Sequence, residues 1–211
     1  EAMASATDLL GGRAPEGELA QRLAFLAEAD RLKTVYRAST LGDASRHENS
    51  AEHSWHLALY ALVMAAHAGA GTDIGRVIRM LILHDLVEID AGDVPIHAAN
   101  GAAHHGAAQA AAEEAAARRI FGLLPAAQGR EFHALWAEFE ENETPDAVFA
   151  KSLDRAQPVM QNIVSGGGSW IEYEVTYTQL VERVGVRIER GAPHLWRWLD
   201  ARAQGFFSRP E

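Results

Sequence analysis

Residues 81–93 (LILHDLVEIDAGD) place a His-Asp pair and further acidic residues in an otherwise apolar segment. Upstream, apolar residues at positions 74, 77, 78, 81 and 82 mark one face of a helix. The same face, seven residues further on from 77, 78 and 81, carries His84, Asp85 and Glu88. Burying an unpaired carboxylate is costly, so these groups need either basic partners or a metal ion.

Two other segments offer side chains that could share such an ion. His53 lies where a Gly/Asp/Ser-rich stretch (41–53) meets an apolar helix pattern, and Asp154 lies on the apolar side of FAKSLDRAQP (149–158). Two imidazoles and two carboxylates suit a divalent cation that keeps positions open for water and substrate. A buried network of ion pairs is the alternative interpretation of the same residues.

The elements that must position these residues all show a helical period. Apolar faces recur in 18–33 (Leu19, Leu23, Leu26), in 55–66 and in 72–90, where Thr72 or Asp73 would be the N-cap. Further helices are expected over 104–124, 130–143, 144–160 and 192–207, and loops over 41–53 and 165–170. We find no alternating strand pattern and no dividing linker, so the prediction is an all-α fold with a single domain.

Composition narrows the class of protein. The 211 residues are 48% hydrophobic and carry a net charge of −10, which argues against a binder of nucleic acid polymers or of membrane surfaces. No apolar run reaches the ~20 residues of a membrane span, and no secretory signal is visible. There is no cysteine, so thiolate metal sites are excluded, and we expect a cytoplasmic protein. Residues 1–18 read as a tail, in which Glu1 and Ala2 before Met3 look like a cloning remnant.

Four blocks of sequence resemble the HD-domain superfamily of metal-dependent phosphohydrolases, and most closely its bacterial 5′-deoxynucleotidase-like branch. They are RLKTVYR (31–37), RHENSAEHSWH (46–56), HDLVEIDAGD (84–93) and ETPDAVFAKSLDRAQP (143–158). The resemblance implies an HD-type helical hydrolase domain over 19–211, with its signature between 31 and 158. It also implies one divalent metal ion (Mn, Co, Ni, Fe, Mg or Zn) and a homodimer. The implied metal ligands are His53, His84, Asp85 and Asp154.

The resemblance also assigns roles around that ion. It makes Glu88 and Asp93 the catalytic or substrate-facing acids and Arg37 a phosphate ligand. The implied substrate is a small phosphomonoester such as a (deoxy)nucleoside 5′-monophosphate, opened by metal-activated water. Near the arginine, where the branch commonly has an aromatic residue, this chain has Ala38, Ser39 and Thr40, which leaves deoxyribose selectivity open.

Two other interpretations compete with this one. Some HD enzymes hold two metals with extra histidines, as phosphodiesterases or oxygenases do, and the candidates here are His97, His104 and His105. A non-catalytic helical binding module is the remaining alternative. Metal stoichiometry and turnover separate these three interpretations.

Near the cluster, Glu48 or Glu52 could support the imidazole of His53, and Lys151 could pair with the acidic groups.

Overall fold

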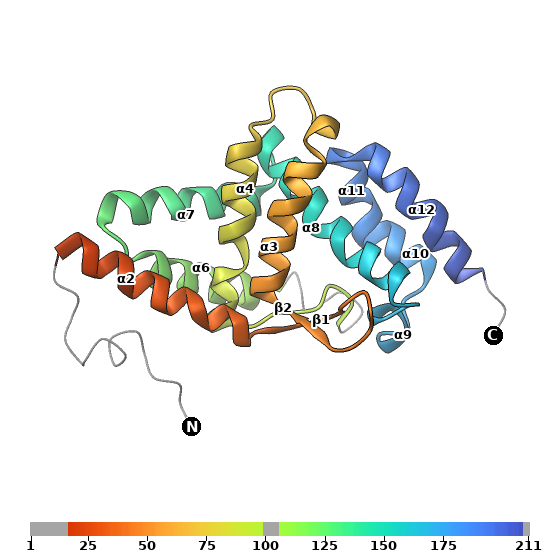
Figure 1. Cartoon of the computed structure of the whole chain (residues 1–211), viewed down its shortest axis with the longest axis horizontal. Helices are drawn as coiled ribbons and strands as arrows, with labels where there is room; N and C mark the ends of the chain where they lie inside the picture. The colour runs from red at the N-terminus through yellow and green to blue at the C-terminus, as the bar shows by residue number, and fades with distance from the viewer. Residues whose placement is uncertain (1–16, 99–105, 209–211) are drawn as a thin grey trace.

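Helices make up most of the computed structural model, which describes residues 17–98 and 106–208 (Figure 1). The first half contains α2 (Gly17–Ala29), η1 (Asp30–Thr34), β1 (Tyr36–Thr40), β2 (His47–Asn49), α3 (Ser50–Val63), η2 (Ala65–His67), α4 (Ile74–Leu83), η3 (His84–Val87) and α5 (Glu88–Ala91). The second half contains α6 (Ala107–Phe121), α7 (Ala126–Glu141), α8 (Pro145–Val164), α9 (Ser169–Glu172), α10 (Tyr177–Leu180), η5 (Val181–Gly185), α11 (Val186–Gly191) and α12 (Pro193–Phe207). Among these residues no helix is long and apolar enough to cross a membrane.

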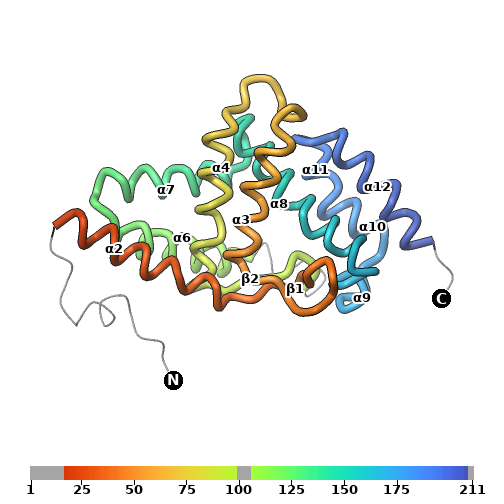
Figure 2. Tube along the Cα trace, in the orientation of Figure 1, coloured from red at the N-terminus to blue at the C-terminus, as the bar shows by residue number. Residues whose placement is uncertain are grey.

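The long helix α8 is the centre of the fold. It packs against α3, α4, α7, α11 and α12, with α3 and α4 in front of it and α10–α12 at one end of the molecule in Figure 2. Its start follows the expected capping, because the Thr144 hydroxyl accepts from the Ala147 N–H and Pro145 occupies the first turn. Most of its residues are buried, including Asp154. The all-α, single-domain prediction is confirmed.

The expected helix 72–90 is divided into three pieces. Asp73 caps α4 by accepting from the N–H groups of Gly75 and Arg76. Of the two residues proposed as the N-cap, Thr72 and Asp73, it is therefore the second. After Leu83 the chain tightens into the 3₁₀ turn η3 before α5. The imidazole Nδ1 of His84 lies 2.8 Å from the Leu81 carbonyl oxygen, the acceptor that an α-helix would use for the N–H of residue 85. A side chain that competes for a backbone acceptor disfavours the regular helix.

The prediction that no strand is present was wrong for one short hairpin. β1 and β2 pair antiparallel, with Tyr36 opposite Asn49 and Thr40 opposite His47. Strands of five and three residues are too short to show an alternating pattern. The hairpin leads directly into α3, where Asn49 and Glu52 form a capping box. It thereby brings Arg37, on β1, beside the start of α3.

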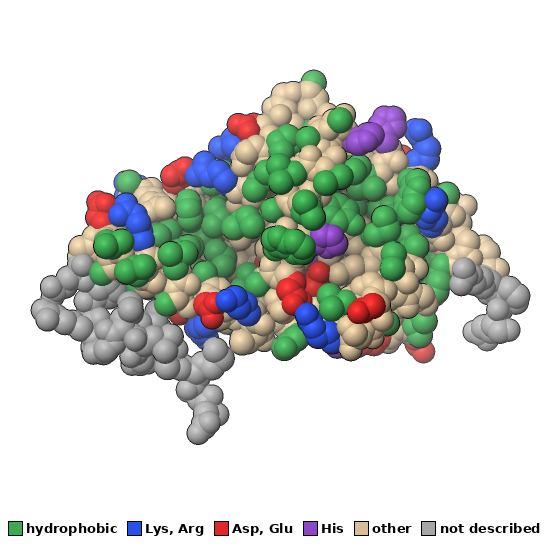
Figure 3. Space-filling model, viewed as in Figure 1, with side chains coloured by type: hydrophobic (Ala, Val, Ile, Leu, Met, Phe, Trp, Pro, Cys, Tyr) green, Lys and Arg blue, Asp and Glu red, His purple; other side chains and the backbone are tan. Residues whose placement is uncertain are grey.

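The apolar faces of α2 and α3 are left exposed by the other residues that the structure describes. Hydrophobic side chains gather on the front face over α2, α3 and α4 (Figure 3). The large side chains exposed by 42–70% there are Leu19, Leu23, Leu26, Trp55, Leu59, Leu62, Val63 and Ile82. The periodicity of these helices was correctly read from the sequence, but its apolar side faces outward. The core lies on the other faces, around residues such as Leu57, Ala61, Met80 and Leu81.

Candidate functional site

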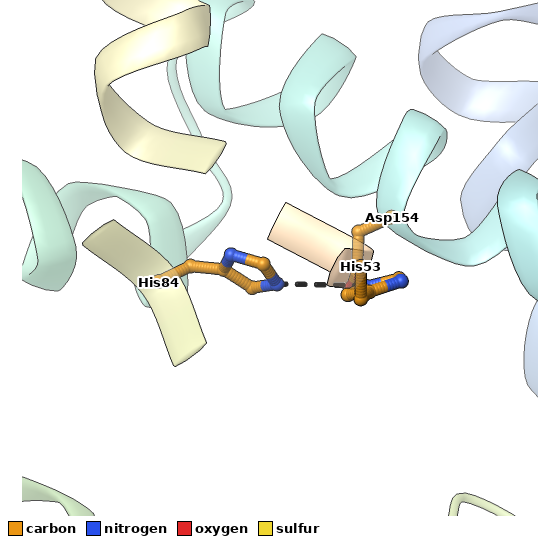
Figure 4. A group of neighbouring side chains, drawn as sticks. All are labelled: His53, His84 and Asp154. Carbon is orange, nitrogen blue, oxygen red and sulfur yellow. Dashed lines mark hydrogen bonds and ion pairs between the residues drawn. The ribbon is translucent and has the colours of Figure 1, made fainter. Parts of the chain in front are cut away.

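Three side chains from distant parts of the chain meet at a buried point. His53 of α3, His84 of η3 and Asp154 of α8 are all buried, and each offers one ligand atom within 4.8 Å of the others. Asp154 Oδ1 lies 3.2 Å from His53 Nε2 and 3.7 Å from His84 Nε2. In Figure 4 the ring of His84 points toward the other two residues.

Both imidazoles present the same nitrogen to this point. The Leu81 carbonyl can only accept, so His84 Nδ1 donates to it at 2.8 Å. The amide nitrogen of Gln157 donates to Glu48 Oε1, so its oxygen accepts from His53 Nδ1 at 3.0 Å. Each Nε2 of a neutral ring therefore has a lone pair available. His84 Nε2 is buried and, among the described residues, faces carboxylate oxygens only, Asp85 Oδ1 at 2.9 Å and Asp154 Oδ1 at 3.7 Å, and this donor set fits a divalent cation.

Asp85 lies at the edge of this group and is held by Arg37. Its Oδ1 is 2.9 Å from His84 Nε2, while Oδ2 accepts from Arg37 Nη1 at 2.8 Å. The same Nη1 lies 3.7 Å from Glu88 Oε1 and 3.5 Å from Asp93 Oδ1. The structure therefore brings all seven predicted site residues together. Arg37 lies among the carboxylates of Asp85, Glu88 and Asp93, and His53, His84 and Asp154 form the tight cluster.

The electrostatics of the group reflect its burial and its excess of carboxylates. Burial alone lowers the pKa of His84, but the attraction of Asp85 and Asp154 outweighs it and raises that pKa to about 10. Burial raises the pKa of Asp85, yet His84 and Arg37 hold it well below its usual range. For Glu88, burial and repulsion from Asp85 raise the pKa well above its ordinary value. Without a metal, a proton on His84 thus supplies part of the positive charge that the carboxylates require.

A cavity of about 280 Å³ opens beside the cluster, close to the lower end of the range for ligand pockets. Six predicted residues line it, namely Arg37, His84, Asp85, Glu88, Asp93 and Asp154. His53 is fully buried behind them. Three arginines of the same wall were not predicted from the sequence, namely Arg155, Arg183 and Arg187. The four-residue spacing of the last two was visible in the sequence, but nothing there linked it to Asp154.

Three charged residues near the cluster, Glu48, Glu52 and Lys151, have different partners. Glu48 is buried, lies 3.4 Å from His53 Nδ1 and accepts from both Gln157 and Gln161. Glu52 instead caps α3 and pairs with Arg46. The suggestion that Lys151 pairs with the acidic cluster was wrong, because its ammonium group is bound to Glu140 at 3.1 Å.

The histidines proposed for a second metal are only partly described. His97 lines the cavity wall near Arg183 and Arg155. His104 and His105 lie outside the described residues. A second metal centre therefore stays a prediction.

Comparison with known proteins agrees with the geometry. The family model "HD domain" matches residues 29–196, so the chain belongs to the HD domain family. A predicted metal-dependent phosphohydrolase from Magnetospirillum magnetotacticum MS-1 is 44% identical in sequence, with a TM-score of 0.84 over 92% of this chain and 95% of that one. PH0347 from Pyrococcus horikoshii OT3, 21% identical with a TM-score of 0.59 over 84% and 98%, shares the fold.

Two curated relatives are more distant in sequence. The 5′-deoxynucleotidase HDDC2 of Homo sapiens is 28% identical over 141 residues, 66% of this chain and 65% of the relative. The protein of the same name from Mus musculus is 29% identical over 150 residues, 70% and 71% of the two chains. The chain thus spans about two thirds of these relatives. Together the comparisons confirm the HD-superfamily resemblance and indicate a hydrolase.

Proposed function

We propose that this protein is a metal-dependent phosphohydrolase that removes phosphate from a small phosphomonoester, a (deoxy)nucleoside 5′-monophosphate in particular. The observation that carries the proposal is the convergence of two imidazole Nε2 atoms and a buried carboxylate beside an arginine-lined cavity. The similarity to 5′-deoxynucleotidases and to a predicted metal-dependent phosphohydrolase supports the substrate class.

The ligand set proposed for the ion is His53, His84, Asp85 and Asp154. Such an ion supplies Lewis acidity toward a phosphate oxygen and toward a bound water. These ligands accept Mn, Co, Ni, Fe, Mg or Zn, and affinity order alone does not choose among them. Manganese and cobalt are therefore the first ions to test, with a single ion per chain expected.

Arg37 has the geometry of a phosphate ligand. Its Nη1 is fixed by Asp85, whereas its buried Nε has no hydrogen-bond partner among the described residues. A phosphate oxygen would satisfy that donor with a charge-assisted hydrogen bond. The carboxylates of the site hold the pKa of the guanidinium above its ordinary value despite burial, so Arg37 stays charged.

Glu88 and Asp93 are the proposed acid–base groups. Burial and the neighbouring carboxylates raise the pKa of both, which moves them toward the range where a side chain exchanges protons near neutral pH. Glu88 Oε2 accepts from the Ser50 hydroxyl at 2.6 Å, which fixes its orientation. We assign Glu88 to the attacking water and Asp93 to the leaving oxygen or to sugar hydroxyls.

Metal content and phosphate release, measured together, test this function. Protein stripped by a chelator and reloaded with Mn²⁺ or Co²⁺ is offered ribo- and deoxyribonucleoside 5′-monophosphates, which also decides the sugar selectivity. We expect one metal per chain and release that Asp85→Asn abolishes. Asp90→Asn is the matched control, since Asp90 pairs with Arg119 and does not line the cavity. Bound metal without release from any monophosphate would refute the nucleotidase assignment.

We also propose a homodimer that covers the exposed apolar face of α2, α3 and α4. The eight large side chains of that face expose several hundred Å² in total, as much as or more than the largest apolar patch of a typical monomer, roughly 300–600 Å². A standard interface buries about 800 Å² on each partner, so a second copy of this face is a matching occupant. The amphipathic periods of both helices are then accounted for.

Sedimentation equilibrium on two charge-introducing variants tests the dimer. Leu62→Glu lies in the middle of the patch and is expected to give a monomer that keeps its fold, because Leu62 is 60% exposed. Val186→Glu, on α11, introduces the same charge at a 50% exposed position outside the patch and is expected to leave the dimer intact. A wild-type monomer at micromolar concentration contradicts the proposal.

A further inference from the structure

The cavity has a basic wall that the proposed chemistry at the metal cluster does not use. Arg155 of α8, Arg183 of η5 and Arg187 of α11 all line it. The carboxylates that line the cavity around Arg37, by contrast, belong mainly to η3, α5 and the segment after it. Glu113 and Glu140 line the cavity as well, and Arg155 Nε lies 3.7 Å from Asp154 Oδ2, so Arg183 and Arg187 are the arginines of this wall that need explaining.

Arg183 and Arg187 lie one helical turn apart on the lining face. Leu180 and Val184 line the cavity as well, so positions 180, 183, 184 and 187 form one face in which both polar residues are arginines. Like charges four residues apart destabilise a helix. Neither arginine forms an ion pair with a carboxylate in residues 17–98 and 106–208, whereas Arg76, Arg79 and Arg119 all do.

The backbone that carries Arg183 is itself unusual. Residues Val181–Gly185 form a π-helical turn, a rare conformation that occurs frequently at functional sites. The turn is packed closely on α12, since a Cβ at Gly185 would lie 2.4 Å from the ring of Trp196. Glycine at this position allows the contact, so the π-helical turn is packed against α12 and is not a loosened helix end.

His97 adds a neutral polar group to the same wall. Burial and the positive charges of Arg183 and Arg155 lower its pKa to about 4, so the ring is uncharged at neutral pH. Its Nδ1 is buried without a hydrogen-bond partner in the described part of the chain. A buried polar atom without a partner is destabilising, and a ligand in the cavity would satisfy it.

We propose that Arg183 and Arg187, with Arg155 and His97 beside them, form a second phosphate subsite, so that the preferred substrate carries a second phosphoryl group away from the one that is cleaved. A nucleoside 3′,5′-bisphosphate has this chemistry. The cavity follows α8 from Lys151 to Asn162, about 16 Å at 1.5 Å per residue, which accommodates a sugar between two phosphates. This inference rests on the proposed function for the assignment of the cleaved phosphate to the metal side.

Paired substrates test the subsite. For the metal-loaded protein, kcat/KM is measured with 2′-deoxyadenosine 5′-monophosphate and with 2′-deoxyadenosine 3′,5′-bisphosphate. We expect the wild type to prefer the bisphosphate by roughly tenfold or more, the effect of one or two charge-assisted hydrogen bonds. Arg183→Gln and Arg187→Gln should each bring the ratio toward one. Arg197→Gln removes a charge from exposed α12 outside the cavity and should keep the wild-type ratio.

Calorimetric binding of the same two nucleotides separates this inference from the proposed function. If neither nucleotide releases phosphate, the nucleotidase assignment fails, yet tighter binding of the bisphosphate that Arg183→Gln weakens still supports the subsite. If the monophosphate is hydrolysed and both nucleotides bind and react equally in all proteins, the function stands and the subsite is refuted. An equal loss of affinity for both nucleotides in Arg183→Gln and in Arg197→Gln would also refute the subsite, since the overall charge of the protein would then explain the effect.

Discussion

Replacing Gln157 by Met tests whether the hydrogen bond behind His53 sets up the metal site. Gln157 accepts from His53 Nδ1 at 3.0 Å and donates to Glu48, and the imidazole is fully buried. Met has a similar volume and cannot accept strongly, so the buried N–H is left with the longer 3.4 Å contact with Glu48 Oε2, at a cost of about 1–3 kcal/mol. At roughly 2–4 °C per kcal/mol for a chain of this size, the metal-free melting temperature should fall by about 2–12 °C.

Metal affinity should fall as well, for a separate reason. Without Gln157, Glu48 Oε2 at 3.4 Å is the acceptor left for the Nδ1 proton, so we expect the proton to shift toward Nε2, where Asp154 accepts at 3.2 Å. The lone pair offered to the ion is then lost. Loss of such an outer partner typically weakens metal binding by about 10–100-fold. Isothermal titration of chelator-stripped protein with Mn²⁺ or Co²⁺ measures the change.

Gln161→Met is the matched control for this experiment. Gln161 also donates to Glu48 Oε1, at 2.8 Å, but has no hydrogen bond to His53. It should therefore lose stability while keeping metal affinity near the wild type. Equal affinities for the two variants would refute the reasoning, because the His53 hydrogen bond would then have no effect on which nitrogen faces the ion.

Two further predictions concern stability. Metal at 100 times its dissociation constant should stabilise the wild type by about 2.7 kcal/mol, visible as a melting temperature roughly 5–11 °C higher than in chelator, and a shift retained by Asp85→Asn would argue against Asp85 as a ligand. Gly168→Ala should cost about 1–3 kcal/mol in urea denaturation, because φ is 43° and a Cβ would lie 2.5 Å from Asn162 Oδ1. Gly205→Ala, in α12 with open space around it, should instead stabilise by about 0.5–1 kcal/mol, and the reverse order would contradict this account.

Helical periodicity was enough to predict most of the fold and the burial of His84 and Asp85. The spacing that puts His84 and Asp85 on the apolar side of their helix also puts them in the interior, and the capping residues Asp73 and Thr144 mark true helix starts. Residue spacing and capping residues are local signals, so they can be recognised in the sequence without knowledge of the tertiary structure. His53 and Asp154 were candidates from their positions beside apolar helix patterns, and the family resemblance then implied that they bind one ion together, since no local rule connects residues 101 positions apart.

What the sequence could not predict depends on contacts between distant segments. An apolar stripe indicates that a helix face is favourable to bury, but it does not identify the surface that covers it. Leu23 and Leu62 belong to such stripes and are nevertheless exposed in this structure. The break after Leu83 coincides with a hydrogen bond from the buried imidazole of His84 to the Leu81 carbonyl, which periodicity alone does not reveal. Arg183 carried no signal in the sequence, because only the folded chain places it in the same cavity wall as Asp154, on another helix.

The short hairpin that periodicity missed explains how Arg37 reaches the site at all. A strand lets β1 run alongside β2 into the start of α3, and the capping box at Asn49 fixes that junction. One guanidinium nitrogen of Arg37 then holds Asp85, while Nε stays buried without a partner in the described residues. A lysine could not divide its charge in this way, because its donors lie on a single atom. The arginine therefore offsets the charge of the acidic group and keeps a donor available for the phosphate that we propose it binds.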